Sequence, residues 1–336
     1  MNGPSKTLAD VGELAFIERI REMAPRDGGL FVRSVGDDCL VTQSFGDDLV
    51  LSTTDTFVDG VHFSRDFFTF EQIGARCMTA AVSDIAAMSG LPVFSLLSLS
   101  MPGTLLFDDA VALFVGLKEA ADLYRCPIVG GETTSTPGPV TITVTVTGRV
   151  EPGREVNRSG ARPGDRIYIT GTIGDSMAGL KAYQNNDSDF EALKAKFRAP
   201  DALVDLSCEL SDRYGISSMI DVSDGVATDL GHICDESGCG AEVDISLLPL
   251  SNEFSRFAKE YDLDAVDFAL SSGEEFELLF TSGDDRLPDE STLIGRRITR
   301  IGMIAGKEHG LSIRRENGEV TKVKQRGYEH FTSGGE

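Results

Sequence analysis

The clearest pattern in the chain is the strict alternation of apolar residues with threonine over residues 140–147. A period of two puts every apolar side chain on one face, which predicts a strand with one buried face and one open face. Such a strand belongs to an antiparallel or mixed sheet. Shorter apolar runs predict neighbouring strands at residues 49–53, 93–99 and 127–129.

Capping signals frame the predicted helices of the first half. Thr69 and Gln72 form a capping box, and Gly90 closes the helix that begins there. A second capping box at Asp10 precedes apolar residues at helical spacing, and residues 108–124 have the same periodicity. The first half therefore predicts helices packed on one face of a mixed sheet.

A Pro- and Gly-rich stretch over residues 151–165 is typical of a domain boundary. Beyond it, strands are predicted near residues 166–170, 218–222, 241–245, 276–281 and 299–304, and helices near 175–184, 201–214, 226–236 and 252–261. A length of 336 residues suits two cores. We expect an α+β protein with domains at 1–152 and 153–331 and a disordered tail at 332–336.

The chain carries 54 acidic and 31 basic residues, a net charge of −23. Such a surface repels nucleic acid and anionic membranes, so phosphate binding would need metal ions, local cations or backbone N–H groups. We find no apolar run long enough to span a bilayer and no signal peptide. The six scattered cysteines predict reduced thiols in a cytoplasmic protein.

Candidate chemistry lies in carboxylates at the ends of the predicted elements. The chain has no G-x-x-x-x-G-K-[ST] loop, so a nucleotide enzyme here needs another scaffold. The acidic positions are Asp38, Asp55, Asp84, Glu132, Asp221 and Asp224. Magnesium prefers oxygen ligands and is held by a few carboxylates together with substrate phosphates. If these side chains converge on one cleft, they suit a nucleotide–magnesium site.

Each candidate also has a structural interpretation that the residues alone leave open. Residues 36–38 and 272–277 could be simple solvent-exposed turns, and Ser83 and Asp84 could be a polar stripe on a surface helix. Asp221 and Asp224 could cap the next helix. Arg158 could be a surface cation, and His62 a structural histidine. Asp84 stands apart because apolar residues surround it on the predicted helix, and a carboxylate there is costly without a partner.

Nine segments, taken in order, resemble the thiamine-monophosphate kinase family. They are GDD (36–38), STTDTFVDGVHF (52–63), SDIAAMSG (83–90), GGETT (130–134), RSGARPGD (158–165), TGTIGDSMAGL (170–180), IDVSDGVATDL (220–230), SGEEFELL (272–279) and GYEHF (327–331). Each is weak alone, but nine in the family's order are specific and span nearly the whole chain. The superfamily also includes aminoimidazole ribonucleotide synthetase.

The resemblance implies an N-terminal α/β domain whose mixed sheet dimerises, and a C-terminal α+β domain. It implies ATP- and magnesium-dependent, in-line phosphorylation of thiamine monophosphate to thiamine diphosphate. The implied metal ligands are Asp38, Thr53, Thr54, Asp55, Asp84, Glu132, Asp221 and Asp224. Gly131, Glu132, Arg158 and Ser223 would contact ATP, and His62, Glu274 and Tyr328 the thiamine phosphate. Asp55, Asp84, Arg158 and Asp221 would carry catalysis.

The chain departs from the family pattern at three places. Glu132 stands where the family usually has Asp, Thr53 where Ser is common, and residues 272–276 replace Gly-Gly-Glu-Asp-Tyr. Two other functions stay open: another ATP-using enzyme of the superfamily, such as an aminoimidazole ribonucleotide synthetase, and a nucleotide-binding regulatory protein without turnover.

Overall fold

The structure is a computed structural model that describes residues 31–33, 37, 39–43 and 46–323. The helix expected from Asp10, the tail 332–336, and two candidate site residues, Asp38 and Tyr328, lie outside the described residues. Within the described part of the chain, no helix is both long enough and apolar enough to cross a membrane.

The first half forms a six-stranded mixed sheet with the order β1-β2-β3-β6-β4-β5. The strands are β1 (Phe31–Arg33), β2 (Leu40–Gln43), β3 (Leu49–Val58), β4 (Leu91–Met101), β5 (Ile128–Ser135) and β6 (Thr141–Val150). Only β4 and β5 pair in parallel; the other described pairs are antiparallel. The mixed sheet expected from the sequence is confirmed.

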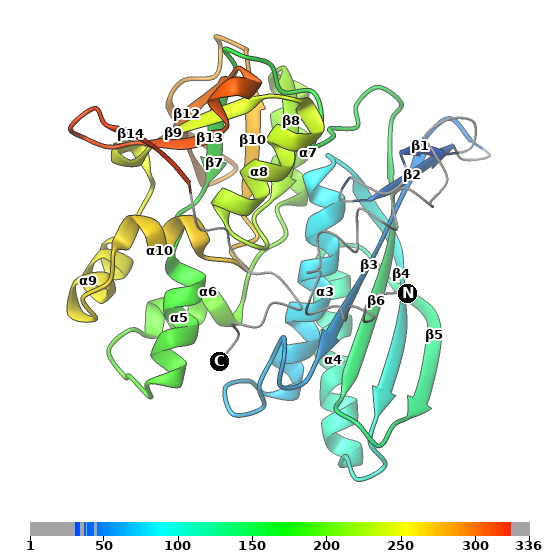
Figure 1. The fold of residues 1–336 in the computed structure, drawn as a ribbon. Helices are drawn as coiled ribbons and strands as arrows, with labels where there is room; N and C mark the ends of the chain where they lie inside the picture. Colours follow the sequence, from blue (N-terminus) through cyan, green and yellow to red (C-terminus); the bar gives the residue numbers. More distant parts are fainter. Residues whose placement is uncertain (1–30, 34–36, 38, 44–45, 324–336) are drawn as a thin grey trace, which may run out of the picture.

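Strand β6 has the two faces that its alternation predicts. Ile142, Val144 and Val146 are buried toward α3 (Phe70–Ala87) and α4 (Phe107–Leu123), which cover one face of the sheet (Figure 1). On the other face, Thr143 and Thr145 share hydrogen bonds of 2.9 and 3.0 Å with threonines of β3. Helices therefore cover one face, and the opposite face carries a ladder of hydroxyl groups.

Two predicted strand ends are wrong. The sequence predicted that these strands end at Thr53 and Val129, but β3 continues to Val58 and β5 to Ser135. The reason is pairing: β3 stays in register with β6 along its whole length, so its threonines and Asp55 have ladder partners. The polar residues thus belong to the sheet instead of following it.

Helix α3 begins with the predicted capping box, in which Thr69 and Gln72 exchange side-chain and backbone hydrogen bonds. Its backbone then contacts that of α4 through two glycines. A Cβ at Gly116 would lie 1.8 Å from the carbonyl oxygen of Glu71, and one at Gly74 would lie 2.2 Å from that of Leu113. Only residues without side chains permit this approach.

The second half contains an eight-stranded sheet with the path β14-β13-β9-β12-β7-β10-β8, and β11 paired to β12. The strands are β7 (Arg166–Thr170), β8 (Ile216–Asp221), β9 (Gly240–Asp244), β10 (Leu278–Ser282), β11 (Glu290–Leu293), β12 (Arg296–Ala305), β13 (Leu311–Arg314) and β14 (Val320–Lys322). Strand β7 is buried on both faces, with Ile167 and Ile169 in one core and Tyr168 in another. The expected two-domain α+β architecture is confirmed.

Six helices flank this second sheet. They are α5 (Asp175–Gln184), α6 (Glu191–Arg198), α7 (Val204–Arg213), α8 (Val226–Ser237), α9 (Asn252–Glu260) and α10 (Ala265–Ser271), with single 3-10 turns at Ile245–Leu247 and Lys307–His309. The sequence did not predict α6, α10, β11, β13 or β14. These elements have at most eight residues, which is too short for a clear period.

Helix α3 lies between its own sheet and the second half of the chain (Figure 1). Ser207 of α7 donates a 2.5 Å hydrogen bond to the carbonyl oxygen of Ala86, and its hydroxyl lies 3.1 Å from that of Ser89. Both sides of α3 are therefore buried, and this helix forms the seam between the two halves.

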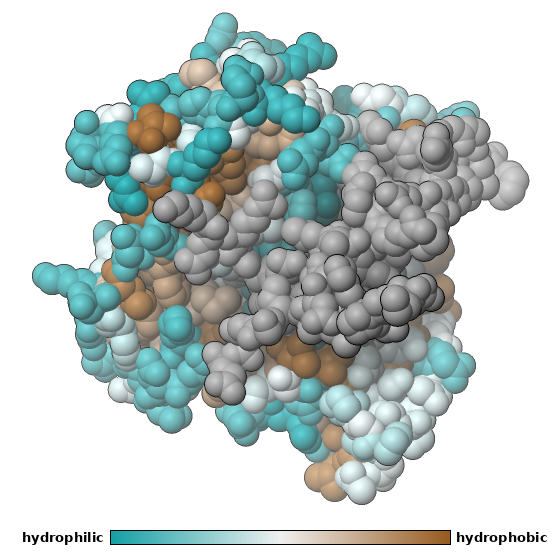
Figure 2. All heavy atoms as spheres, viewed as in Figure 1, coloured by the Kyte–Doolittle hydropathy of each residue, from teal (hydrophilic) through white to brown (hydrophobic). Residues whose placement is uncertain are grey.

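The visible outer surface is mostly hydrophilic, in keeping with the net charge of −23 (Figure 2). Apolar atoms gather at the lower tip of this view, over the start of α4. Leu106 and Phe107 are exposed in that region. The charge of the chain therefore lies mainly on surfaces away from the two cores.

Substituting Gly116 with Ala tests the contact between α3 and α4. Because the new methyl group would overlap the Glu71 backbone, we expect a loss of about 2 kcal/mol in the free energy of unfolding, measured by urea titration. The matched control is Gly231→Ala on α8, where a Cβ would meet no described atom within 4 Å. That change should leave stability equal or raise it by up to about 1 kcal/mol. Equal effects at the two glycines would contradict the close helix contact.

Candidate active site

A cavity of about 590 Å³ lies at the seam between the two halves of the chain. Five of the residues proposed from the sequence line it: Asp55, His62, Ser223, Asp224 and Glu274. They come from β3 and the loop after it, the loop before α8, and the loop before β10. The fold thus brings together three segments that are far apart in sequence.

The buried helix α3 supplies polar groups to this region. Thr53 donates a 2.5 Å hydrogen bond to Oδ2 of Asp84, and Ser83 donates one of 2.6 Å to Oδ2 of Asp221. The second bond joins the first half of the chain to the end of β8. Ser83 and Asp84 are therefore not a polar stripe on a surface helix, and Asp84 has the partner that its apolar surroundings require.

The loop that joins β8 to α8 is held by an aspartate that the sequence analysis missed. Asp229 is 1% exposed, and its Oδ2 accepts hydrogen bonds from the backbone N–H groups of Ser223 (3.2 Å), Asp224 (3.3 Å) and Gly225 (3.1 Å). The suggestion that Asp224 caps α8 is wrong, because Gly225 is the N-cap and Asp229 bonds the loop from the first turn. The sequence signal for this role was the position of Asp229, an acid four residues after Gly225.

Negative charge is concentrated at this loop. Burial, together with the nearby charges of Asp224 and Asp221, raises the pKa of Asp229 well above its usual range, and the charge of Arg158 partly opposes this. Ligand atoms of Asp224, Asp229 and His232 lie within 4.8 Å of one another. Crowded carboxylate and hydroxyl oxygens are a donor set that suits magnesium, which would relieve their repulsion.

The loop before β10 is bonded to the loop before α8. The N–H of Glu274 donates to the carbonyl oxygen of Ser223 at 2.7 Å, and that of Phe276 donates to Val222 at 2.9 Å. Glu274 and Phe276 have φ values of 56° and 52°, an unusual region for residues other than glycine. Such backbone strain persists only where surrounding contacts impose it, so the two loops form one rigid unit.

The interpretation of residues 272–277 as a solvated turn is wrong for two of its acids, because Glu275 and Glu277 are buried. Glu275 accepts bonds from the N–H of Gly174 at 2.8 Å and the hydroxyl of Ser272 at 2.7 Å, and burial raises its pKa to about 8. Glu277 contacts Lys196 Nζ at 2.6 Å. Both acids tie the loop to the second domain instead of facing the cavity.

His62 has a structural contact and also lines the cavity. Its Nδ1 accepts a 3.1 Å hydrogen bond from the N–H of Val58, and its ring meets that of Phe57 edge-on at 6.1 Å. Because Nδ1 is an acceptor, the neutral ring carries its proton on Nε2. The structural interpretation of this histidine is therefore confirmed, and its contact with the substrate stays a prediction.

Arg158 lies close to Asp37 and to the loop before α8. Its backbone N–H donates to Oδ1 of Asp37 at 3.1 Å, and its charge acts on Asp229. Ser237 of α8 donates to the Arg158 carbonyl oxygen at 3.3 Å. Arg158 is thus near the carboxylate cluster, as an anion-binding side chain would need to be.

Three predicted residues are not brought to this cluster by the single chain. Thr54 projects from the open face of the sheet and bonds Thr145. Gly131 and Glu132 lie on β5, three strand spacings from β3, or about 14 Å. Glu132 is in register with Ser98, whose neighbours place it on the open face. The open face therefore carries part of the predicted site.

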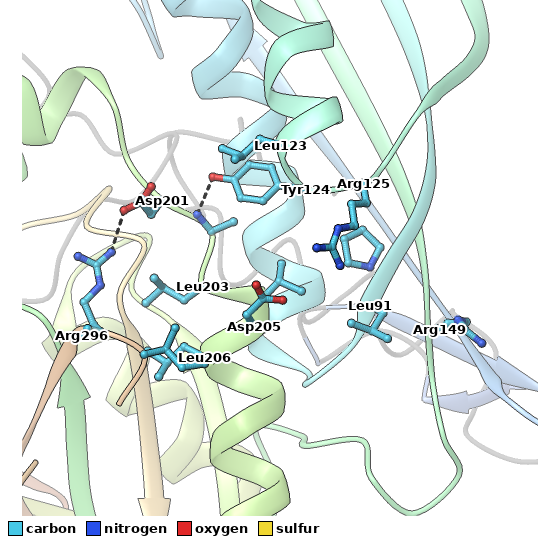
Figure 3. A pocket seen from close by; sticks show the side chains of 15 residues that line it. Leu91, Leu123, Tyr124, Arg125, Arg149, Asp201, Leu203, Asp205, Leu206 and Arg296 are labelled. Carbon is cyan, nitrogen blue, oxygen red and sulfur yellow. Dashed lines mark hydrogen bonds and ion pairs between the residues drawn. The ribbon is translucent and has the colours of Figure 1, made fainter. Parts of the chain in front are cut away.

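A second cavity, of about 550 Å³, lies elsewhere along the seam, where α4 meets the segment before α7 (Figure 3). Arg296 is ion-paired with Asp201 at 3.1 Å, and the Tyr124 hydroxyl accepts the N–H of Ala202 at 3.0 Å. None of the residues proposed for the site lines this cavity. Of these two cavities, only the first is lined by residues proposed from the sequence.

Comparison with known proteins agrees with the fold. Residues 36–150 match the family model of the AIR synthase related protein N-terminal domain, and residues 162–309 match that of the C-terminal domain. The fold and the carboxylate-rich seam therefore define an AIR synthase related protein.

Relatives within this class are more specific. Thiamine-monophosphate kinase of Escherichia coli K12 is 34% identical over 96% of this chain and 99% of its own length, and that of Aquifex aeolicus is 32% identical over the same shares. The solved structure of AaThiL complexed with AMPPCP and TMP has a TM-score of 0.85 at 30% identity, covering 98% of this chain and 100% of that one. The chain belongs to the thiamine-monophosphate kinase family.

The buried Glu275 predicts a pH-dependent stability. Its pKa of about 8 lies above the ordinary value, so between about pH 5 and pH 8 the unfolded chain loses a proton that the folded chain keeps. The free energy of unfolding therefore falls by up to about 1.4 kcal/mol per pH unit as the pH rises through this window. Glu275→Gln should reduce this slope, measured as urea unfolding at several pH values, and the raised pKa of Asp229 accounts for a remaining slope of the same sign. Exposed Glu119→Gln is the control and should keep it; an unchanged slope in Glu275→Gln would contradict the burial argument.

Proposed function

We propose that the protein transfers the γ-phosphoryl group of ATP to the phosphate of thiamine monophosphate, giving ADP and thiamine diphosphate. The observation that carries this proposal is the first seam cavity, which Asp55, Asp224, His62 and Glu274 line together in a chain of this family. The lining combines carboxylates with aromatic rings. This combination suits a substrate that carries both phosphate and an aromatic cation.

The acceptor needs little activation by the protein. A phosphate monoester is already an anion at neutral pH, so the chemistry depends on positioning and on charge neutralisation. Arg158 supplies a cation beside the carboxylate cluster. Glu274 and His62, which line the same cavity, are proposed to orient the thiamine end. Tyr328, which lies outside the described residues, is proposed to contact the same substrate.

Magnesium, when bound, offsets the repulsion between the two phosphate groups. Thr53, Thr54, Asp55, Asp84, Asp221 and Asp224 are the proposed ligands, with Asp38 and Glu132 as further ones. The hydrogen bonds from Thr53 and Ser83 hold two of these carboxylates in place before any substrate arrives. Gly131 and Ser223 are proposed to bind ATP through the backbone or hydroxyl groups that they present.

We also propose that two copies pack through the open faces of their first sheets. This face has no helix over it among the described residues, and it exposes Leu96 amid the threonine ladder. It also carries Glu132, next to Gly131, and a single chain leaves both residues far from β3. Dimer formation would place these two residues at a subunit interface.

We further propose that the domain boundary lies between residues 152 and 153. We also propose that the enzyme works in the cytoplasm, which suits its six cysteine thiols.

Leu96→Glu tests the proposed interface. Burying a new carboxylate between two sheets is costly, so the variant should shift toward monomer at micromolar concentration, as measured by light scattering during gel filtration. Leu123→Glu is the control, because that exposed residue lies at the end of α4, away from the open face. A wild-type monomer, or an unchanged dimer in Leu96→Glu, would contradict the proposed interface.

The reaction itself is tested by measuring ADP release with ATP, magnesium and thiamine monophosphate, with chromatography of the product. Asp55→Asn should lower kcat at least about 100-fold, roughly 3 kcal/mol of barrier, because it removes a charged ligand at the phosphate end. Exposed Asp47→Asn should behave as wild type. Near-normal turnover of Asp55→Asn at saturating magnesium would contradict the proposed mechanism.

The two alternative functions give different results in the same assay. ADP release with another acceptor and none with thiamine monophosphate would favour a different enzyme of the AIR synthase related class. ATP binding without turnover of any acceptor would favour a regulatory nucleotide-binding protein.

A further inference from the structure

Behind one wall of the seam cavity lies a buried arginine that the proposed mechanism does not use. Arg76 sits on the buried helix α3 and is only 4% exposed. Its Nη2 lies 2.8 Å from Oε2 of Glu274, and its Nη1 donates to the carbonyl oxygen of Phe197. A cation that is withdrawn from water in this way requires such partners, because an unpaired buried charge is strongly destabilising.

Aromatic rings surround the same guanidinium group. Its central carbon lies 4.5 Å from the ring centroid of Phe197 and 5.8 Å from the centroids of Phe68 and Phe276. These distances are within the range of cation–π attraction. One planar side chain thereby holds together three segments of the chain: the turn before α3, the end of α6, and the loop before β10.

Every one of these partners lines the cavity. Phe68, Phe197, Glu274 and Phe276 are all among its lining residues, whereas Arg76 is not among the described residues that line it. Arg76 therefore contacts residues that line the cavity without lining it itself. It can affect a bound molecule only through the residues that it holds.

Glu274 is held from two directions. Its backbone has a φ of 56° and is bonded to the Ser223 carbonyl oxygen, while its side chain, 33% exposed, is paired with Arg76. A carboxylate fixed before substrate binding loses less conformational freedom when the substrate arrives. Without the cation behind it, the same carboxylate would be free to adopt other rotamers in the cavity.

We infer that Arg76 is a positioning residue for the acceptor substrate: it fixes the Glu274 carboxylate and the Phe68, Phe197 and Phe276 rings as one recognition wall. This inference rests on the proposed function, in which Glu274 contacts the thiamine end of the substrate. The residues proposed for the phosphate groups, among them Asp55 and Asp224, line the same cavity from other segments of the chain. Arg76 thus governs affinity for the acceptor and has little effect on affinity for ATP.

The test is a double-mutant cycle read out on the two substrates separately. Arg76→Met should raise KM for thiamine monophosphate by about tenfold and leave KM for ATP within about twofold. Arg76→Lys, which keeps the charge but loses the planar fork, should fall between Arg76→Met and wild type. In a Glu274→Gln background, the same Arg76→Met change should raise the acceptor KM at most about twofold, because the residue it positions is already altered.

Arg300→Met is the matched control, since Arg300 is a partly buried arginine paired with Asp289 at 3.2 Å and does not line the cavity. It should leave both KM values unchanged. Far-UV circular dichroism reports whether each variant folds. If Arg76→Met does not fold, Arg76→Lys and Glu274→Gln still decide the matter, and both should raise the acceptor KM selectively.

Two results would overturn the inference while the proposed function stands. One is a parallel rise of both KM values, or a fall in kcat alone, which is what a general structural defect produces. The other is multiplication of the Arg76 and Glu274 effects in the double variant, which would mean that they act independently. A wild-type protein that makes no thiamine diphosphate would instead overturn the proposed function and this inference together.

Discussion

The burial of helix α3 is the constraint on which the rest of the site depends. The helix is covered by its own sheet on one side and by the second half of the chain on the other. Arg76 and Ser83 are buried and Asp84 is partly buried, so these polar side chains must find partners in the protein. Those partners lie in different segments: Asp84 meets Thr53 on β3, Ser83 meets Asp221 on β8, and Arg76 meets Glu274. The need to satisfy these groups fixes the relative positions of the segments that line the cavity.

The two loops from the second domain add a further layer of organisation. They are joined by backbone hydrogen bonds between residues 222–223 and 274–276. Their positions are also held by side-chain hydrogen bonds: Asp229 accepts the N–H of Ser223, and Glu275 accepts that of Gly174. Two residues with positive φ show that these contacts outweigh local backbone preference. A site that must hold two anions close together benefits from such rigidity, because little reorganisation is left for the reacting complex. The negative charges of the crowded carboxylates repel one another, and cations offset this repulsion.

Much of this arrangement was predictable from the sequence, and the reasons for the failures are physical. The alternation of β6 and the capping box of α3 are local signals, and both were confirmed. The carboxylates of the site stand at recognisable motifs, and the fold brings Asp55, Asp84, Asp221 and Asp224 to one region. By contrast, Arg76, Asp229 and Glu275 act through contacts with residues distant in sequence or through the backbone, and no local period reveals such partners. The ends of β3 and β5 were misjudged for the same reason, since pairing with neighbouring strands, which sequence alone does not show, extends them.

The central claim is that the seam cavity, built around α3, receives both substrates. A crystal structure of the protein with magnesium, a non-hydrolysable ATP analogue and thiamine monophosphate tests it most directly. The account predicts the thiamine ring against Glu274 and Phe276, with the phosphate groups beside Asp55 and Asp224. Ligand density in the other cavity, beside Tyr124 and Arg296, with none in the first, would contradict it.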